Sequence, residues 1–165
     1  MRLVRVVACV VVLCLSLVFA GTVAASATWE LLKERQVKMT WATIHGQYGF
    51  VWPQLTPQYQ RVTTRSFWEA CQRKRARQTA GVKWTSVKAT AVYPYRITLP
   101  LFGSTTVAAV SVEATFTYLG STGTVRDTFY WLNGDKGFTS LWDPATYRAY
   151  KAHRCPTYSS PTVLP

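Results

Sequence analysis

The sequence contains few of the residues that most often build catalytic or metal centres. Its 165 residues include two histidines, His45 and His153, and four cysteines. Because Cys9 and Cys14 lie inside an apolar N-terminal run, a zinc site has almost no ligands to draw on. No Ser/His/Asp or Cys/His combination suggests a nucleophilic triad, and the chain has no internal repeats. We therefore expect neither a metal nor a cofactor.

Acidic residues are also scarce. Seven Asp and Glu stand against 19 Lys and Arg, which gives a net charge of +12. Such a charge favours anionic partners, among them cell-wall polymers, acidic lipid headgroups and nucleic acid. The sequence carries no nucleic-acid recognition motif, and its N-terminus indicates export. A cell-envelope partner is therefore expected in preference to nucleic acid.

The N-terminus lacks an apolar run long enough for a typical membrane-spanning helix. Residues 6–20 form an apolar run of 15 residues, preceded by Arg2 and Arg5 and followed by the small residues 25–27. A spanning helix needs about 20 apolar residues, which argues against an uncleaved membrane anchor. Basic, apolar and small-residue segments in this order are typical of a secretory signal peptide. We predict cleavage after Ala27 and a secreted or extracytoplasmic location.

Cleavage would leave 138 residues, which is the length of a single domain, with a net charge of +10. Only Cys71 and Cys155 would remain. Two cysteines in an exported chain most simply form one disulfide, which would contribute roughly 4 kcal/mol in the chain-entropy model. We assign the domain to residues 28–155 and predict a mobile tail, rich in Pro, Ser and Thr, over residues 156–165.

The hydrophobic pattern changes its period near Gly81. Before this point, apolar residues recur at helical spacing over 29–44 and again over about 65–78, with an interrupted stretch around Pro53 and Pro57. After it, alternating β-branched and aromatic residues predict strands. The four strands are expected at about 82–98, 105–118, 124–132 and 137–142, followed by a short helix over 144–152. Helices followed by an antiparallel sheet form an α+β layout.

Three stretches of the sequence resemble segments of a known superfamily. They are WATIHGQYGFVWPQLTPQYQRVTTRSFWEAC (41–71), TFYWLNGDKGFTSLW (128–142) and the closing RCP (154–156). Together with the order of elements, they resemble secreted bacterial members of the NTF2-like (cone-shaped, SnoaL-like) superfamily. The resemblance implies N-terminal helices packed on a curved antiparallel sheet of about four strands. Because this scaffold supports many functions, it implies no single activity.

Pairing the predicted strands creates one apolar sheet face. If residues 119 and 124 flank the second turn, Phe116 opposes Asp127. If Leu132 opposes Gly137, Trp142 lies beside Asp127. Asp127 is then the only acid on a face that consists of Val112, Ala114, Phe116, Tyr118, Val125, Phe129, Trp131, Phe138 and Trp142. We take Phe116, Tyr118, Phe129, Trp131 and Trp142 as candidates for lining a ligand pocket.

Asp127 is the candidate catalytic residue. Desolvation among aromatic side chains raises the pKa of a carboxyl group and can prepare a general base. NTF2-like enzymes resemble this arrangement, since they place an acid inside the cone to move protons on a lipophilic substrate. In the structural alternative, Asp127 pairs with Arg126, Arg96 or a tyrosine. A one-residue slip in register would send it to solvent.

The second predicted helix carries the densest positive charge of the chain. Its basic residues form a candidate surface for an anionic polymer or a lipid headgroup: Arg65, Arg73, Lys74, Arg75 and Arg77. The alternative is a solvated helix face, with cations near the C-terminus stabilised by the helix dipole.

Three functions are compatible with these features. The first is an exported, non-enzymatic domain that binds a small apolar ligand or an anionic cell-envelope partner. The second is a small isomerase or dehydratase that uses Asp127 as its base. The third is a structural or accessory envelope domain with a filled core. The polar face of the sheet also offers a surface for a homodimer.

Overall fold

The structure, a computed structural model, describes residues 28–134 and 137–157. The chain divides into two compact units, Met1–Leu32 and Lys33–Pro165. In the first unit, the described residues 28–32 are helical. The predicted signal peptide (1–27) and most of the predicted tail (156–165) lie outside the described residues. Within the described part of the chain, no helix combines the length and the apolar character needed to cross a membrane.

The helices of the second unit begin where the sequence supplies a suitable first residue. Residues 33–44 are helical, and α2 (Tyr48–Val51), the 3₁₀ helix η1 (Trp52–Gln54) and α3 (Pro57–Gln60) follow as short segments. Pro53 and Pro57 lie in the first turns of η1 and α3, where a missing N–H costs little. The long helix α4 (Arg65–Gln78) is capped by Thr64, whose Oγ1 accepts a hydrogen bond from the Phe67 N–H at 3.2 Å.

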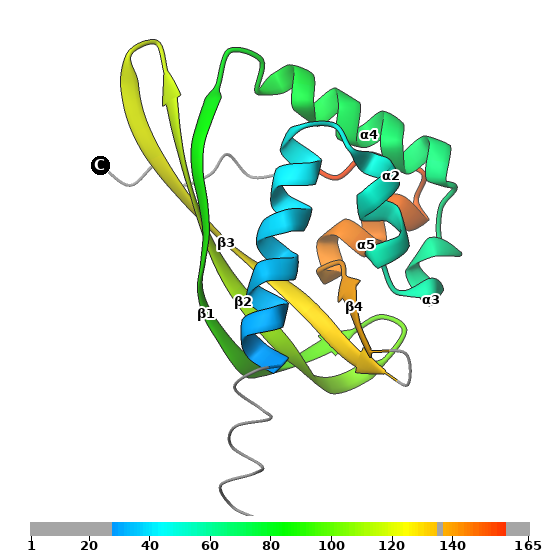
Figure 1. Cartoon of the computed structure of the whole chain (residues 1–165). Helices are drawn as coiled ribbons and strands as arrows, with labels where there is room; N and C mark the ends of the chain where they lie inside the picture. The colour runs from blue at the N-terminus through cyan, green and yellow to red at the C-terminus, as the bar shows by residue number, and fades with distance from the viewer. Residues whose placement is uncertain (1–27, 135–136, 158–165) are drawn as a thin grey trace, which may run out of the picture. The chain divides into compact units, whose positions relative to one another are not determined.

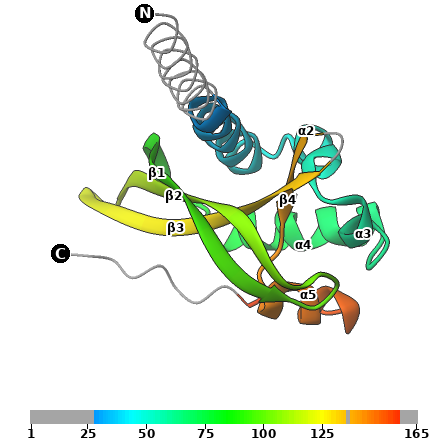
Figure 2. The same ribbon diagram turned by 90° about the horizontal axis from the view of Figure 1, so that it is seen from below.

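The predicted sheet is confirmed. Its four antiparallel strands, in the order β1-β2-β3-β4, are β1 (Lys83–Leu99), β2 (Gly103–Tyr118), β3 (Ser121–Gly134) and β4 (Gly137–Leu141). Two register breaks in β1, between Trp84 and Ser86 and between Ala89 and Ala91, are irregularities of the kind that bend a strand. Figure 2 shows the strands curving. The helix α5 (Pro144–Lys151) follows β4, and the α+β class with one disulfide is therefore correct.

The predicted strand register was wrong by an even number of residues. Asp127 faces Val112, not Phe116, and Gly137 faces Gly134, not Leu132. The β2–β3 turn is the tight pair Leu119-Gly120, with φ values of +48° and +81°, so the strands pair closer to the turn than expected. Because side chains alternate with a period of two, shifts of four and two residues leave each side chain on its predicted face.

One part of the core joins the 33–44 helix to the sheet. Trp131 of β3 is fully buried, and its Nε1 donates a hydrogen bond to the buried Gln36 Oε1 at 2.8 Å. The Arg35 guanidinium lies 5.1 Å from the centre of the same ring. Figure 1 shows this helix in blue, crossing in front of β3.

A second part of the core is aromatic and joins α3 to α5. Tyr59 is fully buried, with its ring 5.2 Å from that of Trp142 and 5.6 Å from that of Tyr147. Trp142 in turn lies 4.5 Å from Tyr150. The Cys71–Cys155 disulfide joins α4 to the segment that follows α5, as the sequence predicted.

Candidate functional site

A pocket of about 520 Å³ lies along the middle of β3, within the size range of ligand sites. Its lining takes residues from both faces of the sheet. Ser111, Thr128 and Tyr130 lie on the face opposite to Trp131, whereas Val112 and Asp127 lie on the same face as Trp131. We call this cavity the β3 pocket, and its lining consists of Thr90, Ser111, Val112, Arg126, Asp127, Thr128, Tyr130 and Asp143.

Small hydroxyl side chains form the wall of the β3 pocket. Thr90 lies at the second register break of β1, and its Oγ1 donates to the Ser111 carbonyl at 3.4 Å. Ser111 pairs directly with Thr128 across β2 and β3. Side chains of this size leave more space than aromatic side chains would. They place hydrogen-bonding groups along the pocket.

Asp127 carries the main titratable group of the pocket. Asp127 is exposed as a residue, but neighbouring protein atoms desolvate its carboxyl group. This desolvation raises the pKa of Asp127 above the ordinary value, and the nearby charge of Asp143 raises it further. A hydrogen bond from the Thr128 N–H to Oδ1, at 2.8 Å, and the charge of Arg75 act in the opposite direction. Arg126 does not pair with Asp127, because its Nε donates to Glu113 at 2.9 Å.

The second carboxylate of the pocket, Asp143, caps the N-terminus of α5. Its Oδ1 accepts hydrogen bonds from the N–H groups of Ala145 and Thr146, at 2.8 and 3.0 Å. Its Oδ2 accepts a third, from the Thr146 hydroxyl, at 2.6 Å. These bonds make Asp143 the N-cap of α5, which is a structural role. Its negative charge still acts on the pocket.

Replacing Asp127 by Asn should stabilise the protein at neutral pH. An acid whose pKa is raised by folding contributes most stability below its unfolded pKa, and part of that stability is lost as pH rises through the folded value. The Asn oxygen can still accept the Thr128 N–H. We expect Asp127→Asn to raise the melting temperature at pH 7, with a difference that shrinks toward pH 3. Thermal unfolding followed by circular dichroism measures it, and a pH-independent difference would contradict the argument.

Three tyrosines extend the β3 pocket along the sheet. The Tyr130 ring lies 5.8 Å from Tyr95 and nearly parallel to it, and Tyr93 meets Tyr95 edge to face at 6.4 Å. Tyr93 and Tyr130 both pair with Ala109, which leaves space for the rings. Tyr93 is 38% exposed and Tyr95 44%. We call Tyr93, Tyr95 and Tyr130 the tyrosine platform.

The tyrosine platform could have been predicted in part. Tyr93 and Tyr95 stand two residues apart in a strand, which is the spacing that places two side chains on one face. The stacking on Tyr130 was missed because it depends on the register of two different strand pairs.

The aromatic residues predicted to line a pocket do not gather around Asp127. Trp131 is packed against Gln36 and Arg35, and Trp142 belongs to the aromatic part of the core. Tyr118 lies exposed at the end of β2. None of these three lines the β3 pocket.

Phe116 and Phe129 also lie apart from the pocket lining. Phe116 packs against Trp84 at 5.4 Å and covers Gly123, where an added Cβ would lie 2.7 Å from the ring. Phe129 pairs with the buried Val110 and is half-buried. Of the predicted site residues on the sheet, Asp127 alone lines the β3 pocket.

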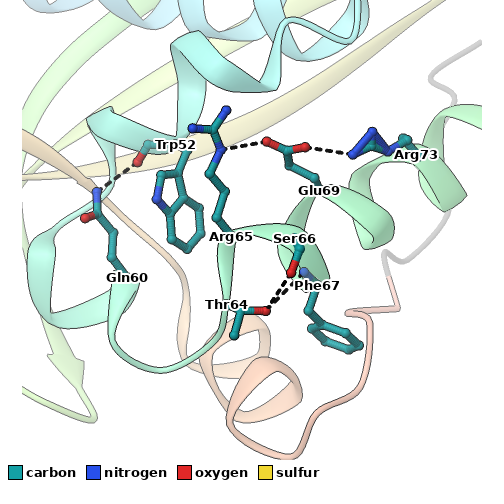
Figure 3. Close-up of polar contacts among 8 residues, drawn as sticks. All are labelled: Trp52, Gln60, Thr64, Arg65, Ser66, Phe67, Glu69 and Arg73. Carbon is teal, nitrogen blue, oxygen red and sulfur yellow. Dashed lines mark hydrogen bonds and ion pairs between the residues drawn. The ribbon is translucent and has the colours of Figure 1, made fainter.

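The predicted basic surface lies on α4 and is partly neutralised. Glu69 accepts hydrogen bonds from Arg65 and Arg73, each at 2.7 Å, and Figure 3 shows it between the two. These bonds, first the one from Arg65, lower the pKa of Glu69. The last two turns of α4, which carry Lys74, Arg75 and Arg77, are exposed. Positive charge therefore concentrates at the C-terminal end of α4.

Within residues 28–134 and 137–157, no three His, Cys, Asp or Glu side chains come together in a group that could hold a metal ion. Fold and site together define an α+β domain with a polar pocket beside exposed tyrosines. No family model, curated protein or solved structure matches the chain.

Proposed function

We propose that this chain is an exported, non-enzymatic binding protein whose β3 pocket takes a small hydroxylated ligand of the saccharide type. The observation that carries the proposal is a hydroxyl-lined pocket that continues into the tyrosine platform. A sugar ring presents an apolar face that can lie on an aromatic ring and hydroxyl groups that exchange hydrogen bonds with Ser, Thr and carboxylate oxygens. The N-terminal sequence supports export, and the order of elements supports an NTF2-like scaffold.

The lining favours a polar ligand over the apolar one expected from the sequence. Apart from Val112, every residue of the β3 pocket has a polar or charged side chain. The large aromatic side chains that would hold an apolar ligand, Trp131 and Trp142, are buried against other parts of the protein. An apolar ligand would displace water from these hydroxyl and carboxylate groups without replacing its hydrogen bonds, which would cost free energy.

Titration with soluble oligosaccharides tests the proposal. We expect tetra-N-acetylchitotetraose or maltotetraose to bind, measured by calorimetry. Tyr130→Leu should weaken binding about tenfold because the ring contact is lost. The matched control is Tyr118→Leu, which removes an exposed tyrosine of the same sheet outside the pocket and should leave affinity unchanged. If both saccharides fail to bind while 1-anilinonaphthalene-8-sulfonate binds in a Tyr130-dependent manner, the ligand is apolar. Binding of no probe favours a structural role.

A proton-transfer enzyme is the second candidate, supported by the raised pKa of Asp127 and the nearby phenol of Tyr130. Asp127 would act as the base, in an isomerase or dehydratase reaction. Asp127→Asn separates the two proposals. In the enzyme, it abolishes deuterium exchange from solvent into a lipophilic ketone. In the binding protein, no such exchange occurs in either form and saccharide binding is retained.

A further inference from the structure

The tip of the β2–β3 hairpin exposes a large apolar side chain. Leu119 is 86% exposed, the highest value among the large hydrophobic residues that the structure describes, and the adjoining Tyr118 is 46% exposed. Such a side chain gains nothing from packing within the domain. It is therefore available to a partner.

Leu119 also adopts a backbone conformation that leucine disfavours. Its φ is +48°, and it precedes Gly120 at +81°, in a two-residue turn that asparagine followed by glycine fits best. A bulky residue with positive φ is a strained choice at this position. Strained residues of this kind concentrate at functional sites. The fold itself thus gives no reason for a leucine here.

Positive charge borders this tip. An added Cβ at Gly81, just beyond α4, would lie 3.5 Å from the Tyr118 ring, and Lys83 pairs with Thr117. The exposed end of α4 with Lys74 and Arg77 leads directly into this segment. Figure 1 shows the C-terminal end of α4 and the β2–β3 hairpin at the same end of the molecule. We call Lys74, Arg77, Lys83, Tyr118 and Leu119 the hairpin end.

We propose that the hairpin end docks on an anionic lipid bilayer, with Leu119 and Tyr118 entering the interfacial region and the three cations contacting headgroups. Amphipathic surfaces that bind bilayers combine these two features. Cations near an anionic leaflet each strengthen binding roughly fivefold. A hydrated cell-wall polymer would engage the cations but would offer no apolar region to Leu119. The proposal rests on export of the domain and does not depend on a ligand in the β3 pocket.

Sedimentation with vesicles tests the role of Leu119. The exported protein is mixed with vesicles of phosphatidylcholine and phosphatidylglycerol (3:1) or of phosphatidylcholine alone. Leu119→Asn should lower the partition coefficient on the anionic vesicles about tenfold, since one buried leucine is lost from the interface. The same substitution should raise the melting temperature, because Asn tolerates the positive φ. A binding loss therefore cannot be attributed to unfolding. The matched control is Leu101→Asn in the β1–β2 hairpin, a leucine that is 44% exposed, and it should leave binding unchanged.

A second pair of variants tests the charge. Lys74→Gln with Arg77→Gln should weaken binding to anionic vesicles about 25-fold, from two cations at fivefold each. The control is Arg148→Gln with Lys151→Gln, which removes the same charge from exposed positions of α5 and should have a smaller effect. The proposal is overturned if wild type fails to bind anionic vesicles, or if Leu119→Asn binds them as wild type does. Leu119-independent binding to soluble poly(glycerol phosphate) would assign the cations to a polymer instead.

Discussion

Reduction of the Cys71–Cys155 disulfide is expected to lower the free energy of unfolding by about 2–4 kcal/mol. The bond closes a loop between residues 84 positions apart, and its loss returns the entropy of that loop to the unfolded chain. It joins α4 to the segment after α5, and the other two cysteines, Cys9 and Cys14, lie in the predicted signal peptide.

Without the disulfide, α5 is held against α4 by noncovalent contacts, so reduction should act first on α5. Gln72 Nε2 donates to the Tyr150 hydroxyl at 3.0 Å, and Phe67 meets Tyr150 edge to face at 6.5 Å. These contacts are local and weaker than the covalent link. We expect reduction to accelerate hydrogen exchange in α5 under conditions in which the rest of the domain stays folded.

Thermal unfolding with and without dithiothreitol measures the effect. The melting temperature of wild type should fall on reduction. The melting temperature of the Cys71→Ser/Cys155→Ser double variant should equal that of reduced wild type and should not change when dithiothreitol is added. Equal melting temperatures for oxidised and reduced wild type would show that native contacts alone hold the end of the chain.

The sequence alone predicted the class of fold because its signals are local. Alternation with a period of two identifies strands whatever their partners, and Thr64 and Asp143 mark helix starts through their own side chains. For the same reason, the face on which Asp127 lies was predicted correctly even though its partner, Val112, was not. A face depends on parity, whereas a partner depends on turn length.

The turn was mispredicted because Leu119 has a positive φ, which leucine rarely adopts. Residues 119–123 read LGSTG, and either Leu119-Gly120 or a longer loop could close the hairpin. Leucine rarely takes a positive φ, so the longer loop was the more natural prediction. The structure places the strain at Leu119 instead. Leu119 therefore caused the error in the predicted register, and it is also the most exposed large hydrophobic residue of the hairpin end.

The candidate site was harder to predict than the fold, because it depends on which face each helix covers. Trp131 and Asp127 share a face of the sheet by register, yet the 33–44 helix buries Trp131, and Asp127 is exposed. Nothing in the alternation of β3 distinguishes these two environments. The burial of Gln36, a polar residue on a helix, is the feature that hydrophobic periodicity could not reveal.

Trp131→Ala should cost about 3–5 kcal/mol of stability, because it empties a fully buried aromatic site. It also leaves the Gln36 Oε1 without the indole N–H and removes the ring beneath Arg35. Gln36→Leu should cost about 1–3 kcal/mol, since it leaves the buried indole N–H unpaired. Urea unfolding of both variants gives these values.

The decisive comparison uses Trp131→Phe alone and combined with Gln36→Leu. Phenylalanine keeps most of the buried ring and lacks the N–H, so Gln36→Leu should cost less in that background than in wild type. Because Trp131 does not line the β3 pocket, Trp131→Phe should leave saccharide affinity unchanged. If the two substitutions are additive, the Trp131–Gln36 hydrogen bond contributes nothing to stability. If Trp131→Phe abolishes ligand binding in a folded protein, Trp131 contacts the ligand, as the sequence first suggested, and the site lies on the sheet face that Trp131 shares with Asp127.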